Sequence, residues 1–179
     1  MLKIESLHAT VADKPLSVRP VTSADAPELA DLLNAIIARG GTTALETPFT
    51  PERLDATYLT GPKVLSCVVA VDGERLEGFQ TLVREPHLPE GWGDIGTVSR
   101  VDGAQRGVGS ALFAATRDRA RALGLAGINA QIRADNAGGL AFYTRMGFAD
   151  EHIDRAVPLA DGTPVDRINK RFSLGATNG

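Results

Sequence analysis

The chain has 179 residues, of which 43% are hydrophobic and 23% charged, and its formal net charge is −3. This length and apolar content suit a single domain with a sizeable core. There is no Lys/Arg run to bind nucleic-acid phosphates, no apolar stretch near the ~18 residues of a membrane helix, and no signal-peptide pattern at the N-terminus. We therefore expect a cytoplasmic protein without nucleic-acid or membrane partners.

The residue types that bind metals or form disulfides are sparse. Cys67 is the only cysteine, which excludes an internal disulfide and a cysteine-based zinc site. The three histidines, His8, His87 and His152, are far apart and lack ligand spacing. No metal site is predicted.

The first predicted elements are a short strand over residues 16–19, which Pro20 ends, and two helices. The first helix follows a Thr22–Asp25 capping box and has apolar residues at helical spacing as far as Gly40-Gly41. Thr50-Pro51 begins the second helix, which Gly61-Pro62 ends. Before them, residues 1–15 are expected to be a leader. Residues 16–174 are expected to form the domain, and residues 175–179 a disordered tail.

The remaining elements alternate between strands and helices. Strands are predicted over 64–71 and 76–83 around the hairpin turn Asp72-Gly73, then over 94–101 after a Pro/Gly loop at 85–93. Next come a helix over 107–123 with Gly124 as its left-handed cap, a strand over 128–133, a helix over 138–146, and two strands around Ala160-Asp161-Gly162. Strand–helix–strand units give parallel neighbours and hairpins give antiparallel ones. The sequence thus predicts an α/β (α+β) domain with about four helices and a mixed, mostly antiparallel sheet of six to seven strands.

A glycine-rich segment, Ala104-Gln105-Arg106-Gly107-Val108-Gly109-Ser110, lies between a predicted strand and the long helix. Glycines let an oxygen approach the backbone, and the free N–H groups and positive end of the helix favour an anion such as pyrophosphate. Arg106 adds a possible charge-assisted contact. The segment lacks both the GxxxxGK[ST] pattern and the third glycine of the dinucleotide fingerprint. The alternative interpretation is a plain turn into a helix.

This loop, followed by Asn136 and Tyr143-Thr144-Arg145-Met146-Gly147-Phe148, resembles the two central motifs of the GNAT superfamily of acyl-CoA-dependent N-acyltransferases. Residues 19–25 resemble the first strand-to-helix junction of that family, so the resemblance covers nearly the whole chain. The family pattern begins with Gln or Arg where this chain has Ala104. The resemblance implies a GNAT-like fold with splayed central strands, acetyl-CoA as co-substrate, no metal, a small-molecule amine acceptor and a homodimer.

The resemblance also implies which residues bind the co-substrate. A backbone N–H near Thr97 would stabilise the oxyanion of the reacting thioester, and Tyr143 would hydrogen-bond to the departing thiolate. A core tyrosine and ordinary strand residues are the alternative interpretations of these positions. The full set of expected contacts is Thr97, Val98, Ser99, Ala104, Gln105, Arg106, Gly107, Val108, Gly109, Ser110, Asn136 and Tyr143.

The acceptor amine requires a base, because deprotonating an alkyl ammonium of pKa ~10 at pH 7 costs ~4 kcal/mol. Asp94 is the first candidate, at the expected start of its strand, and Glu46 in the loop before Thr50 is the second. Residues 34–53 also resemble the acceptor side of phosphinothricin-type amino-acid acetyltransferases. Those enzymes carry glutamate in place of Asp94 and usually histidine in place of Tyr143.

The function predicted from these features is transfer of acetyl from acetyl-CoA to a primary amine of a small amino-acid-like or amine compound. Direct attack in a ternary complex is expected, because Cys67 lies in an apolar strand and offers no covalent nucleophile near the motifs. The alternatives are a peptide or protein N-acetyltransferase and a non-catalytic module that binds acyl-CoA.

Overall fold

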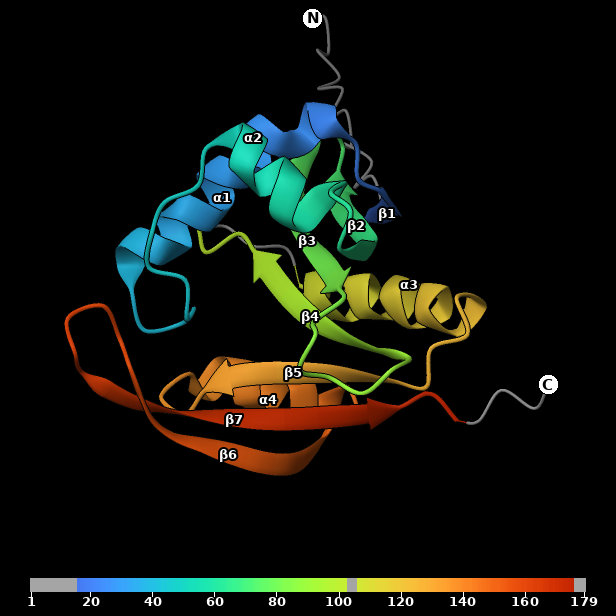
Figure 1. Cartoon of the computed structure of the whole chain (residues 1–179). Coiled ribbons are helices and arrows are strands. Elements are labelled where there is room, and N and C mark those ends of the chain that lie inside the picture. The colour runs from blue at the N-terminus through green and yellow to red at the C-terminus, as the bar shows by residue number, and fades with distance from the viewer. Residues whose placement is uncertain (1–15, 103–105, 176–179) are drawn as a thin grey trace, which may run out of the picture.

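The computed structural model describes residues 16–102 and 106–175 (Figure 1). Ala104 and Gln105, the expected leader 1–15 and all of the expected tail except Gly175 lie outside the described residues. The predicted order of elements is confirmed: β1 Ser17–Pro20, η1 Ser23–Asp25, α1 Ala26–Arg39, α2 Pro51–Leu54, η2 Asp55–Leu59, β2 Val64–Asp72, β3 Arg75–Val83, β4 Trp92–Ser99, α3 Val108–Ala122, β5 Gly127–Arg133, α4 Ala137–Arg145, β6 Ala149–Pro158 and β7 Pro164–Ser173.

The strands form one seven-stranded sheet in the order β1-β2-β3-β4-β5-β7-β6. Every neighbouring pair is antiparallel except β4 and β5, which are parallel. The long helix α3 connects these two strands, as a parallel crossover requires. The predicted mixed, mostly antiparallel sheet is therefore confirmed.

Helices cover both faces of the sheet (Figure 1). We call the side covered by α1 and α2 the front face and the side covered by α3 and α4 the back face. The front core joins leucines of α1 and α2 to Val69 and Phe79 of the sheet. The back core joins Phe113 of α3 and Tyr143 of α4 to Ile128 and neighbouring strand residues. Strand residues alternate between these two cores, as the period of a strand dictates.

The second helix differs from the prediction of one regular helix up to Gly61. Thr50 caps it as expected, because its Oγ1 accepts a hydrogen bond from the N–H of Arg53 at 3.2 Å. After α2, however, the chain continues as the π-helical turn η2, and the N–H of Thr60 donates to the carbonyl of Asp55 at 3.0 Å. A Cβ at Gly61 would lie 1.7 Å from the carbonyl oxygen of Ala56, so the close approach that ends this helix requires glycine.

The strand β4 begins two residues earlier than predicted and ends at Ser99 rather than Val101. Trp92 and Gly93 belong to the strand because they pair with Gly127 and Ile128 of β5. The expectation that Asp94 starts the strand was therefore wrong. Asp94 is its third residue, with strand partners on both sides.

Residues 16–102 and 106–175 contain neither a membrane-spanning helix nor a cluster of metal-binding side chains. None of the helices there is long and apolar enough to cross a membrane. The same residues contain no cluster of three or more His, Cys, Asp or Glu side chains able to hold a metal ion.

Candidate functional site

The central strands β4 and β5 separate in the middle of the sheet. They pair only at Trp92–Gly127, Gly93–Ile128 and Asp94–Asn129. Beyond this point β4 stays paired with β3 up to Ser99, and β5 stays paired with β7 up to Arg133. The two halves of the sheet therefore diverge from the Asp94–Asn129 pair, which confirms the predicted splay.

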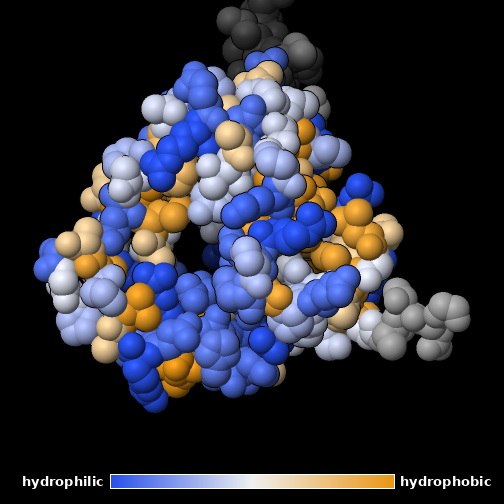
Figure 2. Space-filling model, in the orientation of Figure 1, coloured by the Kyte–Doolittle hydropathy of each residue, from blue (hydrophilic) through white to orange (hydrophobic). Residues whose placement is uncertain are grey.

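A cleft of about 610 Å³ occupies the space that the splay opens. Figure 2 shows the surface hollowed beside the hydrophilic side of β5, β6 and β7. The cleft brings together elements from the whole chain: the segment after α1, the strands β3 to β5, the first turn of α3, one side of α4 and Arg167 of β7. The predicted site residues that line it are Asp94, Thr97, Val98, Ser99, Gly109, Asn136 and Tyr143.

The two candidate catalytic groups, Asp94 and Tyr143, approach the cleft from opposite faces of β4. Ile95 packs in the back core with Tyr143, whereas Val98 packs against the front core. Because side chains alternate along a strand, Asp94 lies on the front face and Thr97 on the back face. The splay therefore lets a molecule in the cleft meet a carboxylate on one side and hydroxyl groups on the other.

On the back face, Tyr143 is hydrogen-bonded to Thr97. The Tyr143 hydroxyl lies 2.8 Å from Thr97 Oγ1, which also accepts a hydrogen bond from Gln80 Nε2 at 2.9 Å. Tyr143 is only 7% exposed, and burial raises the pKa of its phenol far above the usual value. The phenol therefore stays protonated and is suited to donating a hydrogen bond rather than to releasing its proton readily.

On the front face, Asp94 sits at the vertex of the splay beside Asn129. Asn129 Nδ2 donates to Asp94 Oδ1 at 2.8 Å, and Asn129 is completely buried. Burial raises the pKa of Asp94 to about 6, although the hydrogen bond from Asn129 opposes part of that shift. A carboxylate with this pKa is mostly ionised at pH 7 and is still basic enough to accept a proton, as a general base requires.

The described part of the glycine loop contains two glycines with different roles. Gly107 has a positive φ of +84°, which allows the turn into α3. No atom lies within 4 Å of the position that a Cβ would take there, so the space at the start of α3 is open. A Cβ on Gly109 would instead lie 2.7 Å from the ring of Phe142 on α4. We expected both glycines to make room for an anion. At Gly109 the structure shows a close approach of α4 as well.

The other residues of the predicted loop take different places. Val108 is buried against Leu112 in a small core between α3 and the sheet, so only its backbone faces the loop. Arg106 and Ser110 are exposed, and neither lines the cleft. Ala104 and Gln105 lie outside the described residues. The first N–H groups of α3 lack partners within the helix, as at any helix start, which keeps them available to a ligand.

Asn136 and Glu46 fasten the segment after α1 over the cleft. Asn136 Oδ1 accepts from Gly139 N at 2.9 Å and caps α4 as predicted, while its Nδ2 donates to the carbonyl of Thr42 at 2.8 Å. Glu46 Oε2 accepts from the N–H of Ala160, in the turn between β6 and β7, at 2.8 Å. Glu46 is not among the residues that line the cleft. Its observed contact is with this turn rather than with the space beside Asp94.

Polar residues of β3, β5 and β7 extend the site beyond the predicted set. Gln80 holds Thr97, and Asn129 holds Asp94. Gln131, Arg133 and Arg167 line the front part of the cleft. The alternation of apolar and polar residues from Ile128 to Arg133 was visible in the sequence, and it could have identified a polar face on this strand. Nothing in the sequence indicated which residues of β7 face it.

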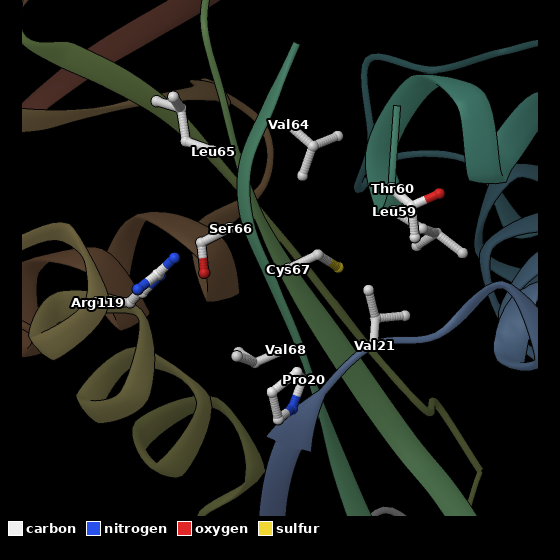
Figure 3. Close-up of a pocket in the computed structure, with 10 residues that line it drawn as sticks. All are labelled: Pro20, Val21, Leu59, Thr60, Val64, Leu65, Ser66, Cys67, Val68 and Arg119. Atoms are coloured by element: carbon white, nitrogen blue, oxygen red, sulfur yellow. The ribbon is translucent and has the colours of Figure 1, made fainter. Parts of the chain in front are cut away.

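A second hollow of about 480 Å³ lies beside β2, beyond the end of β1 (Figure 3). Figure 3 shows the thiol of Cys67 pointing toward Val21 and Leu59. Burial raises the pKa of Cys67 to about 12, so this thiol is not a ready nucleophile. The cleft at the splay and the hollow at Cys67 share no lining residue, and the latter contains none of the predicted site residues.

The fold is shared with known acetyltransferases. A GNAT-superfamily phosphinothricin acetyltransferase from Sinorhizobium meliloti, solved in complex with acetyl-CoA, superposes with a TM-score of 0.79 at 21% identity, covering 92% of this chain and 91% of that one. An N-acetyltransferase from Staphylococcus aureus gives 0.78 at 15% identity, with coverages of 90% and 99%. An acetyltransferase of the GNAT family from Streptococcus pneumoniae gives 0.75 at 19% identity, with coverages of 90% and 100%.

Sequence comparison gives the family directly. No curated protein is significantly similar in sequence to this chain. The family model described as "Acetyltransferase (GNAT) family" matches residues 34–148, which include β4, the described part of the glycine loop and α4. The chain therefore belongs to the acetyltransferase (GNAT) family, and the predicted enzyme class, an acetyl-CoA-dependent N-acyltransferase, is confirmed.

Proposed function

We propose that the protein transfers the acetyl group of acetyl-CoA to a primary amine of a small, amino-acid-like acceptor, by direct attack in a ternary complex. One observation carries this proposal: the cleft at the splay has Asp94 on its front face and the Tyr143–Thr97 pair on its back face. An amine entering from the front and a thioester held from the back would then meet between the two groups.

The back of the cleft suits the acyl-CoA. The free N–H groups at the start of α3, together with Arg106, suit the pyrophosphate, and Gly107 leaves the approach open. Beyond Asp94, the β5-facing edge of β4 has no strand partner among the described residues, so its backbone groups can pair with the amides of a pantetheine arm.

The chemistry divides between the two faces. The amine nitrogen attacks the thioester carbonyl carbon, so a C–N bond forms and the C–S bond breaks. Before this attack, Asp94 takes a proton from the acceptor ammonium, directly or through a water molecule, which frees the nitrogen lone pair; the second proton that the nitrogen loses goes to the departing thiolate. A backbone N–H of Thr97, Val98 or Ser99 stabilises the oxyanion, and the Tyr143 hydroxyl donates a hydrogen bond to the departing sulfur. Because burial raises the pKa of this phenol, Tyr143 stays protonated and stabilises the thiolate mainly by donating a hydrogen bond.

A two-part experiment tests the proposal. In the first part, acetyl-CoA at about 100 times its dissociation constant should stabilise the fold by ~2.7 kcal/mol. In the second, release of free CoA should be measured with a panel of small primary amines, and with peptides as a separate arm. Acetyl-CoA should stabilise the protein, and a small amine should trigger CoA release.

The other outcomes distinguish the alternatives. Stabilisation without release by any amine would indicate a binding module. Release with peptides alone would indicate a peptide or protein acetyltransferase. The absence of any thermal shift with millimolar acetyl-CoA would contradict the assignment of the cleft.

A further inference from the structure

The front part of the cleft contains two arginines, Arg133 and Arg167, which differ in whether a carboxylate neutralises their charge. Arg133, at the end of β5, makes a bidentate pair with Asp135, with N–O distances of 2.9 and 2.7 Å, and its Nη1 donates to the carbonyl of Thr43 at 3.2 Å. Arg167 of β7 is its direct neighbour in register. The carboxylate of Asp135 therefore neutralises the charge of Arg133, and the hydrogen bond to Thr43 fixes the segment after α1.

Arg167 has no comparable partner. Its hydrogen bond is to a neutral group, Gln131 Oε1, at 3.3 Å. None of the ion pairs within residues 16–102 and 106–175 includes it. Asp154 is its neighbour on β6, but Asp154 Oδ2 already accepts from Asn169 and Gln131. Arg167 is half-buried and lines the cleft, so it presents unused N–H donors to whatever occupies that space.

Arg167 and Asp94 lie on different strands that border the same cleft. Asp94 pairs with Asn129, and Arg167 pairs with Arg133, four residues further along β5. At about 3.3 Å per residue this is about 13 Å along the strand direction, and the two strand spacings from β4 to β7 add about 10 Å across the sheet. Both side chains line the same cleft, so one small molecule in it can contact both groups.

We propose that Arg167 binds a free carboxylate of the acceptor, so that the acceptor is an amine with a carboxylate at its other end. The planar guanidinium fork matches the two oxygens of a carboxylate, and the half-buried cleft strengthens such a charge-assisted pair. The acceptor's ammonium then lies toward Asp94 with its charge complemented, and the carboxylate fixes which end of the molecule faces the thioester. This inference rests on the proposed acetyl transfer and adds the residue that selects the acceptor.

The experiment measures kcat/KM for matched acceptors: L-amino acids and the amines that remain when each loses its carboxylate. The wild type should prefer the carboxylate-bearing member of a pair by at least about tenfold. Arg167→Gln should lower kcat/KM for that member by about 10- to 100-fold, mainly through KM, and should leave the decarboxylated member nearly unchanged. Arg167→Lys should fall between the two, because it keeps the charge but loses the fork.

Two controls separate recognition from folding. Arg155→Gln removes an exposed arginine of the neighbouring strand, paired with Asp166, and should change neither acceptor. The acetyl-CoA affinity of Arg167→Gln should equal that of the wild type. If both members of each pair react equally well, or if Arg167→Gln lowers them equally, the inference is overturned while the proposed acetyl transfer stands. If no small amine reacts at all, the proposed function fails and the inference fails with it.

Discussion

The back and front walls of the cleft are built in different ways. The back wall consists of two short local segments: the first turn of α3, which contains Gly109, and α4 with its Asn136 cap. The front wall is held by side chains that join distant segments, such as Asn136 to Thr42 and Glu46 to Ala160. The back wall thus depends on backbone groups of local motifs, which suits a co-substrate with a fixed structure. The front wall depends on individual side chains, which suits recognition of one particular acceptor.

The largest effect is expected at Asp94, where the two walls meet. Asp94→Asn keeps the shape and can still accept the hydrogen bond from Asn129, but it cannot take a proton. Turnover near neutral pH should fall by about 10²- to 10⁴-fold, and the loss should shrink as pH rises, because more amine arrives deprotonated. Wild-type activity should fall below pH ~6, as Asp94 with its pKa of about 6 becomes protonated. A pH–rate profile of the variant that overlays the wild type would remove Asp94 from the mechanism.

The same substitution should have an opposite effect on stability. The pKa of Asp94 is raised from 3.8 to about 6 in the folded protein, so the folded state binds the proton more tightly than the unfolded chain. This group's contribution to stability is therefore lost as pH rises from about 4 to about 6, by at most about 3 kcal/mol. Denaturant unfolding should show that the free energy of unfolding of Asp94→Asn rises relative to that of the wild type between pH 4 and pH 8. A difference in free energy of unfolding that stays constant across this range would show that folding does not raise the pKa of Asp94.

On the back wall, Tyr143→Phe should lower turnover by about 10- to 100-fold, at the low end of general-acid effects. The phenol holds its proton too tightly to be a strong acid, and thiolate is already a tolerable leaving group. Acetyl-CoA affinity and the melting temperature serve as controls, because the ring remains in the back core. A loss beyond a thousandfold in a folded variant would mean that proton transfer to sulfur limits the reaction.

A substitution at Gly109 tests whether this position requires glycine because of the co-substrate or because of the packing of α4 against α3. Gly109→Ala places a Cβ 2.7 Å from the ring of Phe142, so α4 or the ring must shift, at a cost of about 1–3 kcal/mol of stability. Acetyl-CoA affinity should fall more than acceptor affinity. The double variant with Phe142→Leu should recover both stability and acetyl-CoA affinity. A stable double variant that still binds acetyl-CoA as weakly as Gly109→Ala would place the pyrophosphate directly against this residue.

The smallest effect is expected at Glu46. Glu46→Gln keeps an oxygen that can accept from the Ala160 N–H, but it replaces a charge-assisted hydrogen bond with a neutral one. The segment above the cleft should loosen slightly, and the acceptor KM should rise by about two- to fivefold with kcat unchanged. Glu52→Gln, an exposed residue of α2, is the matched control. A drop of kcat comparable with that of Asp94→Asn would instead make Glu46 the base.

The sequence by itself determined the elements and the back wall. Periodicity, caps and the glycine loop are local signals, so they predicted the order of strands and helices, the start of α3, and the cap at Asn136. The same kind of signal placed Asp94 in the right strand, although at its start instead of at the vertex of the splay. Family resemblance added the splay, which the structure confirms, and the expected role of Tyr143 toward the departing thiolate, which stays a prediction.

Only the tertiary structure decided which residues meet across the front wall. Strand pairing brings Asn129 to Asp94 and Arg133 to Arg167. Of these two arginines, Arg133 pairs with the carboxylate of Asp135, whereas Arg167 is in none of the ion pairs among the described residues. Glu46 was predicted from its loop, but it lies against a turn more than a hundred residues away in sequence. These contacts depend on the register of strands and on the path of loops between segments distant in the chain. No local pattern of residue types encodes either of them.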